Sequence, residues 1–164
     1  MRINLCEIID IPGKSLPFTC ELEEERLSLP AISEFISPVL AKGLIINTAG
    51  VLTLTGDVSA QLLCVCDRCG TEFRHEVKLP LSLKLAADLN DEENPDIYPL
   101  IGNELDLSDL LETNFILNAD AKYLCREDCA GLCSRCGKNL NEDKCTCVKE
   151  IDPRLAVLQQ LLDK

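Results

Sequence analysis

One five-residue pattern occurs twice in this chain of 164 residues, as Cys66-Asp-Arg-Cys69-Gly70 and as Cys133-Ser-Arg-Cys136-Gly137. A gap of two residues between cysteines lets the backbone turn tightly, with both sulfurs facing one point, and the glycine supplies the positive φ that closes the turn. Each copy is therefore typical of half a metal site. The pattern constrains the fold strongly, because one metal ion can hold segments that lie far apart in the chain.

Eight of the eleven cysteines gather around these two motifs. Eight thiolates are the number needed for two four-cysteine zinc sites, and two partitions are open: one local set with one mixed set, or the two motifs facing each other. Closing a short local loop costs less entropy than closing one of about sixty residues, which favours the first partition. In this partition the local set is Cys133, Cys136, Cys145 and Cys147, and the mixed set is Cys66, Cys69, Cys125 and Cys129. We expect one zinc ion at the local set, and the mixed set has the ligands for a second.

The remaining cysteines and the absence of a targeting segment indicate a reduced compartment. Cys6, Cys20 and Cys64 lie in strand-like sequence, where small buried side chains are the expectation. The first residues contain no long apolar run, so we predict neither a signal peptide nor a membrane span. Clustered cysteines in such a chain bind metal or do redox work more often than they form disulfides. The sequence therefore predicts a cytoplasmic protein.

Charge is distributed unevenly along the chain, whose formal net charge is −12. Residues 1–120 carry 8 basic and 21 acidic side chains, whereas residues 121–164 carry 8 basic and 7 acidic ones. Such a protein should not coat nucleic acid by general phosphate neutralisation, and its acidic part is better matched to a basic protein.

The order of hydrophobic and polar residues predicts an α+β fold with a β-rich, antiparallel body. Strands are expected within residues 1–11, 16–22, 39–47, 51–65 and 73–85, with a hairpin around Gly50 and an exposed acidic loop at residues 90–99. Asp106 is a predicted N-cap for a short helix that presents Leu107, Leu110, Leu111 and Phe115. We predict two units: the body, residues 1–120, and the cysteine-rich tail, residues 121–164, which ends in a helix after Asp152-Pro153.

Residues capable of catalysis are sparse. The single histidine, His75, shares a strand face with Phe73 and Val77, which predicts a core or edge residue, and no nucleophile, phosphate-binding or dinucleotide motif is present. Cys-x-x-Cys is also the motif of thiol oxidoreductases, but glycine follows each pair here and no βαβ pattern surrounds it. We predict a protein that is not an enzyme, with a thiol-based redox or metal-sensing role as the alternative.

Short segments near the end of the chain resemble the C-terminal signature of the bacterial YceD family. They are Leu124-Cys125, Glu127-Asp128-Cys129, Gly131-Leu132-Cys133, Cys136-Gly137, Asn139-Leu140-Asn141, Cys145, Cys147 and residues 151–156, and Cys66-Asp-Arg-Cys69 resembles the family's central motif. Two departures are Ser134, where proline is common, and Gly70, where leucine is often found; neither changes a ligand. The resemblance implies a non-enzymatic role in ribosome biogenesis, in the accumulation of large-subunit ribosomal RNA.

Two modes of binding are compatible with this role. The nearly neutral tail can contact ribosomal RNA or a large-subunit assembly intermediate through basic side chains, for which the candidates are Arg126, Arg135, Lys138, Lys144 and Lys149. Alternatively, the acidic body can hold a basic ribosomal protein. We expect no membrane and no small-molecule substrate as a partner.

Overall fold

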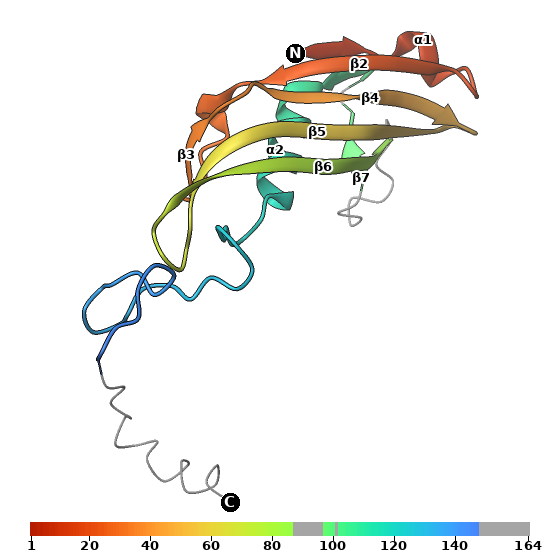
Figure 1. The fold of residues 1–164 in the computed structure, drawn as a ribbon. Helices are drawn as coiled ribbons and strands as arrows, with labels where there is room; N and C mark the ends of the chain where they lie inside the picture. Colours follow the sequence, from red (N-terminus) through yellow and green to blue (C-terminus); the bar gives the residue numbers. More distant parts are fainter. Residues whose placement is uncertain (87–96, 101, 148–164) are drawn as a thin grey trace, which may run out of the picture.

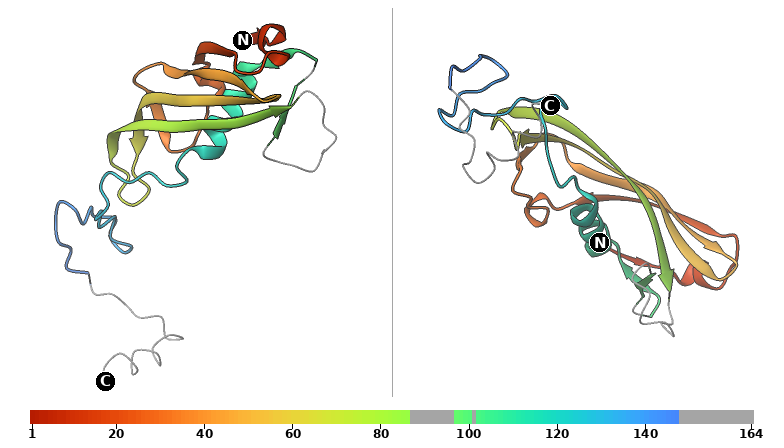
Figure 2. Two further views of the ribbon diagram at one scale, coloured as in Figure 1. Left: turned by 90° about the vertical axis from the view of Figure 1, so that its right-hand side faces the viewer. Right: turned by 90° about the horizontal axis from the view of Figure 1, so that it is seen from below.

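A curved β-sheet forms the centre of the molecule, for which a computed structural model describes residues 1–86, 97–100 and 102–147 (Figures 1 and 2). The order of the main path is β2-β4-β5-β6-β7, and β3 pairs with β5 off this path. These strands are β2 (Ser15–Leu22), β3 (Ile32–Phe35), β4 (Val39–Thr48), β5 (Val51–Val65), β6 (Glu72–Ala86) and β7 (Ile97–Pro99). All pairings are antiparallel except that of β7 with β6.

The remaining elements are short. Strands β1 (Arg2–Asn4) and β8 (Glu104–Asp106) form a second, two-stranded sheet. Helix α1 (Cys6–Ile9), the 3-10 helix η1 (Glu24–Arg26) and helix α2 (Leu107–Asn118) complete the set. The predicted α+β class with a β-rich body is confirmed. No helix among these described residues is long and apolar enough to cross a membrane.

Strand β5 shows why the sheet has one buried face. Its even-numbered apolar residues, including Leu54, Val58 and Leu62, are fully buried, whereas the odd-numbered positions between them are polar or partly exposed. This period of two is the signal that predicted a strand over residues 51–65, and the strand has those bounds. The buried positions of β5 pair with inward-facing positions of β4 and β6, so the three strands form one wall of the core.

Helix α2 covers the inner, concave face of the sheet (Figure 2). The predicted N-cap is confirmed, because the Asp106 side chain accepts a hydrogen bond from the Asp109 backbone N–H at 3.4 Å. Leu107, Leu111 and Phe115 are fully buried against the strands. Apolar spacing of three and four residues therefore places one stripe of the helix in the core, as the sequence predicts.

Three expectations are corrected by the structure. Residues 1–11 form only a three-residue strand before helix α1, because the Asn4 side chain accepts from the Cys6 backbone N–H at 2.8 Å and turns the chain. The end of the predicted loop at residues 90–99 is strand β7, and residues 90–96 lie outside the described part. Cys6 is exposed, whereas Cys20 and Cys64 are buried as predicted. The predicted C-terminal helix also lies outside the described residues.

Two glycines face each other at the centre of the sheet and allow its curvature. Gly43 of β4 pairs with Gly56 of β5, and the ring of Phe18 from β2 packs over Gly43. A β-carbon on Gly56 would meet the Lys42 carbonyl oxygen and come within 2.7 Å of the Gly43 Cα. Both neighbours are backbone atoms, which cannot move aside as a flexible side chain would.

We predict that Gly56→Ala destabilises the protein, since the added methyl group forces two paired strands apart. The expected loss in the free energy of unfolding is about 2 kcal/mol, measured by urea denaturation of the full chain. Ser59→Ala, in the same strand but on its outer face, is the matched control and should change stability by less than about 0.5 kcal/mol. Equal stability of the two variants would contradict this account of the close approach between the two strands.

Candidate metal centre

The two Cys-x-Arg-Cys-Gly motifs fold into the same tight turn. In the loop between β5 and β6, the Gly70 backbone N–H donates to the Cys66 carbonyl at 2.8 Å, and Gly70 has φ of 70°. In the tail, the Gly137 N–H donates to the Cys133 carbonyl at 2.8 Å, and Gly137 has φ of 71°. The left-handed conformation suits glycine and explains its position in both motifs.

The first cluster joins the body to the tail. Its members, Cys66, Cys69, Cys125 and Cys129, have sulfur atoms that all lie within 4.8 Å of one another. The Cys66 and Cys129 sulfurs are 3.8 Å apart, and those of Cys69 and Cys125 are 3.7 Å apart. Four sulfurs placed about 2.3 Å from a zinc ion in a tetrahedron lie roughly 3.8 Å from one another. The spacing of these sulfurs therefore fits a tetrahedral metal ion.

The second cluster is local to the tail. Cys133, Cys136, Cys145 and Cys147 also have sulfurs within 4.8 Å of one another, and Cys136 is exposed. Of the two partitions considered from the sequence, the structure brings together the local set and the mixed set. Each cluster offers four soft donors and can hold a metal ion of the kind that thiolates prefer.

The thiols of the first cluster are electrostatically unequal. Burial opposes ionisation of Cys66, but hydrogen bonds from the backbone of Cys125, Arg68 and Cys69 outweigh it and lower the pKa of this thiol to about 6. Burial and the neighbouring sulfurs, with that of Cys129 first, raise the pKa of Cys125 to about 12. Thiolate charge on one side of the cluster thus keeps a proton on the other side.

The second cluster repeats this division. Backbone N–H groups of Cys136 and Arg135 are the main reason that the pKa of Cys133 falls to about 6. The sulfur of Cys136, followed by burial, raises the pKa of Cys147 to about 12. Four thiolates at this spacing need a cation between them, because each additional negative charge is opposed by those already present. Binding of a dication would release the remaining protons.

Hydrogen bonds accompany the sulfur contacts between body and tail. The Asp67 carboxylate accepts from the Tyr123 backbone N–H at 2.7 Å, and the Asp67 N–H donates to the Tyr123 carbonyl at 2.9 Å. Arg68 donates to the Cys129 carbonyl at 2.9 Å, while its own carbonyl accepts from the Leu132 N–H at 3.0 Å. Arg68 thus binds the backbone of the tail through hydrogen bonds. This role could not be predicted from the sequence, because its partners are main-chain atoms far along the chain.

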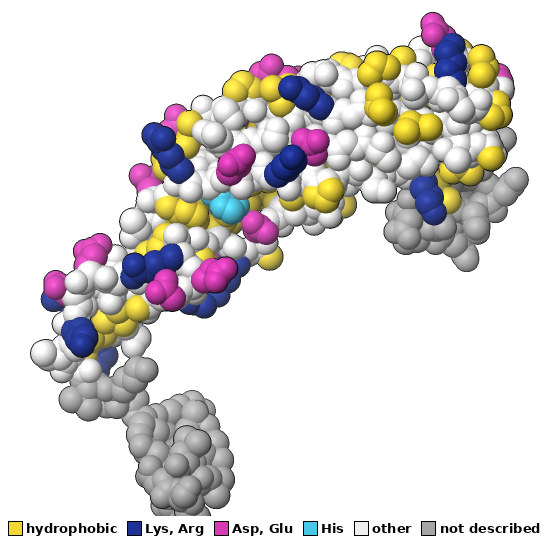
Figure 3. Space-filling view, turned by 45° about the vertical axis from the view of Figure 1, so that its right-hand side comes forward, with side chains coloured by type: hydrophobic (Ala, Val, Ile, Leu, Met, Phe, Trp, Pro, Cys, Tyr) yellow, Lys and Arg dark blue, Asp and Glu magenta, His cyan; other side chains and the backbone are white. Residues whose placement is uncertain are grey.

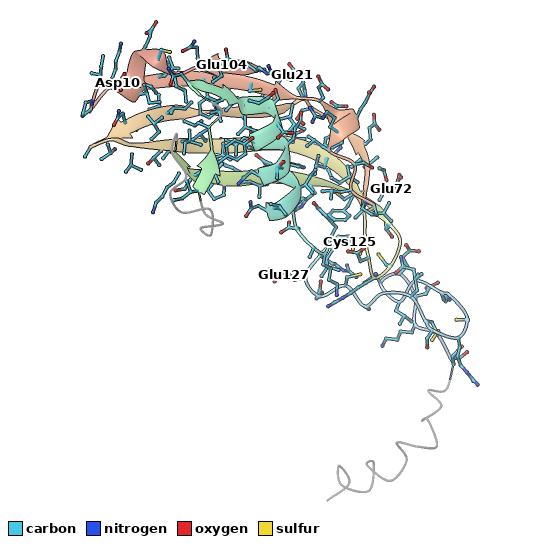
Figure 4. The ribbon with its side chains drawn as sticks, turned by 180° about the vertical axis from the view of Figure 1, so that it is seen from behind. Asp10, Glu21, Glu72, Glu104, Cys125 and Glu127 are labelled. Atoms are coloured by element: carbon cyan, nitrogen blue, oxygen red, sulfur yellow. The ribbon has the colours of Figure 1, made fainter. Side chains whose placement is uncertain are left out.

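His75 lies at the margin of this junction. Its side chain is 32 % exposed, its Nε2 is 3.3 Å from the Asp120 carboxylate, and its ring makes edge contacts with Phe73 and Tyr123. These contacts fit the core or edge residue predicted from the strand pattern. Figure 4 shows Cys125 and Glu127 in the loops of the tail, beyond the end of the sheet.

The candidate RNA-binding side chains are distributed over the tail, and Figure 3 shows basic groups among acidic ones on one of its faces. Arg126 donates to the Asn141 side-chain oxygen at 2.7 Å and lies 3.4 Å from Asp128. The Lys138 ammonium is 3.0 Å from Asp143. Arg135 and Lys144 are exposed in the same loops, and Lys149 lies outside the described residues.

Comparison with known proteins gives a family match. A family model described as "Large ribosomal RNA subunit accumulation protein YceD" matches residues 54–162, which include both cysteine motifs. Uncharacterized proteins of Mycobacterium bovis and Mycobacterium tuberculosis are each 32 % identical over 117 residues, which is 69 % of this chain and 56 % of theirs. The chain thus spans about half the length of the curated relatives it matches. No solved structure matches the chain.

We predict that Cys66→Ser loosens the tail from the body without unfolding the sheet. The backbone N–H groups of Tyr123 and Leu132, which donate to the loop between β5 and β6, should exchange with solvent at least about tenfold faster. Amides at the centre of β5 should keep their protection, as measured by hydrogen exchange. Cys6→Ser changes an exposed thiol outside both clusters and is the control. Unchanged exchange at Tyr123 and Leu132 would show that the first cluster does not hold the tail.

Proposed function

The chain belongs to the YceD family of large ribosomal RNA subunit accumulation proteins, and we propose that it is a binding factor in large-subunit assembly and not an enzyme. The family description links it to accumulation of ribosomal RNA but names no mechanism. This proposal rests on the arrangement of charges and cysteine clusters. The sheet body is acidic, and the tail, which the first cluster links to the body, carries basic side chains among acidic ones.

We propose that zinc is the metal and that both clusters hold it, at eight ligands: Cys66, Cys69, Cys125 and Cys129, and Cys133, Cys136, Cys145 and Cys147. Each cluster offers four thiols at tetrahedral spacing, which is the donor set of closed structural zinc sites. Bound zinc would fix the loops that carry these cysteines. The side chains of Asp67 and Arg68 orient the tail on the body, because both hydrogen bond to the backbone of the tail.

The best supported function is contact with large-subunit ribosomal RNA through the tail, in the cytoplasm, where bacterial ribosomes assemble. Residues 121–147 carry five basic and four acidic side chains, and each four-thiolate zinc site adds roughly −2. Bulk attraction of phosphate is therefore weak, and binding must depend on individually placed groups. Arg126, Arg135, Lys138, Lys144 and Lys149 are the candidates, with the first and third already oriented by neighbouring carboxylates.

We predict that affinity for a large-subunit RNA fragment falls by about a hundredfold between roughly 50 and 200 mM salt, since about four phosphate contacts release their counterions. The double variant Lys138→Ala/Lys144→Ala should reduce the slope of log K against log salt by about 2. Filter binding with labelled RNA measures both quantities. Lys42→Ala/Lys84→Ala removes the same charge from exposed positions of the sheet and should leave the slope unchanged. Binding that is insensitive to salt would refute tail contact with RNA.

A second candidate is that the body holds a basic ribosomal protein. The supporting observation is an exposed acidic run at the end of β2, where Glu21, Glu23, Glu24 and Glu25 line a shallow surface hollow; Figure 4 labels Glu21. Arg26, which follows, is engaged with Asp109 and Glu112 of α2, so it does not neutralise the run. This candidate requires that the purified chain binds a basic ribosomal protein at moderate salt without RNA.

The redox or metal-sensing alternative has less support. In the first cluster, Cys66, Cys69 and Cys129 are 2 %, 6 % and 3 % exposed, which leaves little access for an oxidant or a thiol partner. Such a role would have to use the second cluster, in which Cys136 is exposed. The role would require a thiol that alkylates readily in the metal-loaded chain.

We predict a metal content of about two zinc ions per chain, which follows from two complete sets of four ligands. Cys133→Ser should reduce this content to about one ion, because three thiolates and a hydroxyl group hold zinc poorly. The sheet body should persist, since its core does not include the second cluster. Atomic absorption with parallel circular dichroism is the measurement, and Cys6→Ser is again the control. Full zinc content in the Cys133→Ser chain would exclude that cysteine as a ligand.

A further inference from the structure

The Asn141 side chain connects the loop of the second cysteine cluster to the first cluster. It belongs to the loop between Cys136 and Cys145, which carries the second cluster, yet its Nδ2 lies 3.3 Å from the sulfur of Cys129, a member of the first cluster. It is thus a side chain from the loop of one site that hydrogen bonds to a candidate ligand of the other.

Every hydrogen-bonding position of this amide is used. Nδ2 donates to the Cys129 sulfur and, at 2.8 Å, to the Asn139 side-chain oxygen. Oδ1 accepts from the Ala130 backbone N–H at 2.8 Å and from Arg126 at 2.7 Å. An amide has two donor hydrogens and two acceptor lone pairs, so this set fixes the orientation of the group. Exchanging its oxygen and nitrogen would place the oxygen against a Cys129 thiolate and the Asn139 oxygen, and the nitrogen against two donors.

The position of Asn141 is in turn set by the loop of the second cluster. The Asn141 backbone N–H donates to the Asn139 side-chain oxygen at 3.0 Å, and the neighbouring Leu140 N–H donates to the Gly131 carbonyl at 2.9 Å. Cys133 closes the same loop through its N–H, which donates to the Lys138 carbonyl at 2.8 Å. Ordering this loop by a metal ion would therefore hold the amide against the sulfur.

We propose that the two metal sites are coupled through Asn141, so that metal binding at the second cluster increases the affinity of the first. A hydrogen bond donated to a thiolate ligand stabilises its charged form and fixes its direction, and loss of such outer groups reduces metal affinity by about 10- to 100-fold. The coupling is reciprocal, as thermodynamic linkage requires: the first site strengthens the second by the same factor. Asn141 is a positioning residue and not a ligand.

The coupling links the local fold of the tail to its attachment. The second cluster alone organises a loop within the tail, whereas the first attaches the tail to the body. With coupling, loss of metal from the second cluster, which is less buried than the first, also weakens the attachment. This inference rests on the metal proposal but is independent of what the tail binds.

The test is a thermodynamic cycle on the full chain with cadmium as the probe metal. Cadmium NMR gives one signal for each site, assigned with Cys66→Ser and Cys145→Ser, and a competing chelator gives the affinity of the first site. Removing the second site with Cys145→Ser/Cys147→Ser should lower first-site affinity about tenfold. Asn141→Ala should lower first-site affinity by a similar factor. Adding Asn141→Ala to the Cys145→Ser/Cys147→Ser chain should lower it little further. Lys144→Gln, an exposed substitution in the same loop that makes no side-chain contact with Asn139 or Asn141, is the control and should have no effect.

If the alanine variant disturbs the loop, Asn141→Asp provides a second test. Aspartate keeps oxygens for the Ala130 N–H and for Arg126 but loses the donor to sulfur, so first-site affinity should fall at least as far. Wild-type affinity of the first site in Asn141→Ala or Asn141→Asp would overturn the coupling. So would a loss of first-site affinity on removal of the second site that is equally large with and without Asn141. Two cadmium signals without coupling would refute this inference alone, whereas no signal would refute the metal proposal as well.

Discussion

The position of the tail depends on the convergence of four sulfurs, two from the loop between β5 and β6 and two from the tail. Among the described residues of the tail, only Tyr123, Cys129 and Gly131 are buried, so it has almost no apolar core of its own. Apart from Tyr123, which joins the core of the sheet, burial of hydrophobic surface contributes little there. The convergence of the four sulfurs and the hydrogen bonds of Asp67 and Arg68 link the tail to the body.

The body meets a different constraint. Long strands β5 and β6 form the wall on which α2 packs, and the glycine pair at Gly43 and Gly56 lets that wall bend around the helix. The same two strands end in the loop that carries Cys66 and Cys69, so a rigid hairpin places these sulfurs. The stability of the sheet thus determines how accurately the first cluster is formed, although the core of the sheet does not include it.

Much of this organisation could be predicted from the sequence because it rests on local signals. Alternation predicted β5 over residues 51–65, Asp106 and the leucine spacing predicted α2, and loop entropy favoured the cysteine partition that the structure forms. Strand β7 was missed, because a three-residue strand has no period to recognise and its parallel pairing is set by the sheet. The contacts of Arg68 and Asn141 were missed for a similar reason: both depend on which distant segments the cysteines bring together. The boundary near residue 120 stays a prediction.

We propose that the attached tail brings this protein to assembling large-subunit RNA. The decisive experiment is a gentle pull-down of the full chain from cell extract, with and without ribonuclease, in which RNA and proteins are both identified. The account predicts recovery of large-subunit precursor RNA, loss of the accompanying proteins after ribonuclease, and much lower RNA recovery with the Cys66→Ser chain. Recovery of a basic ribosomal protein that survives ribonuclease, with no enrichment of precursor RNA, would contradict the claim and favour a role in holding that protein.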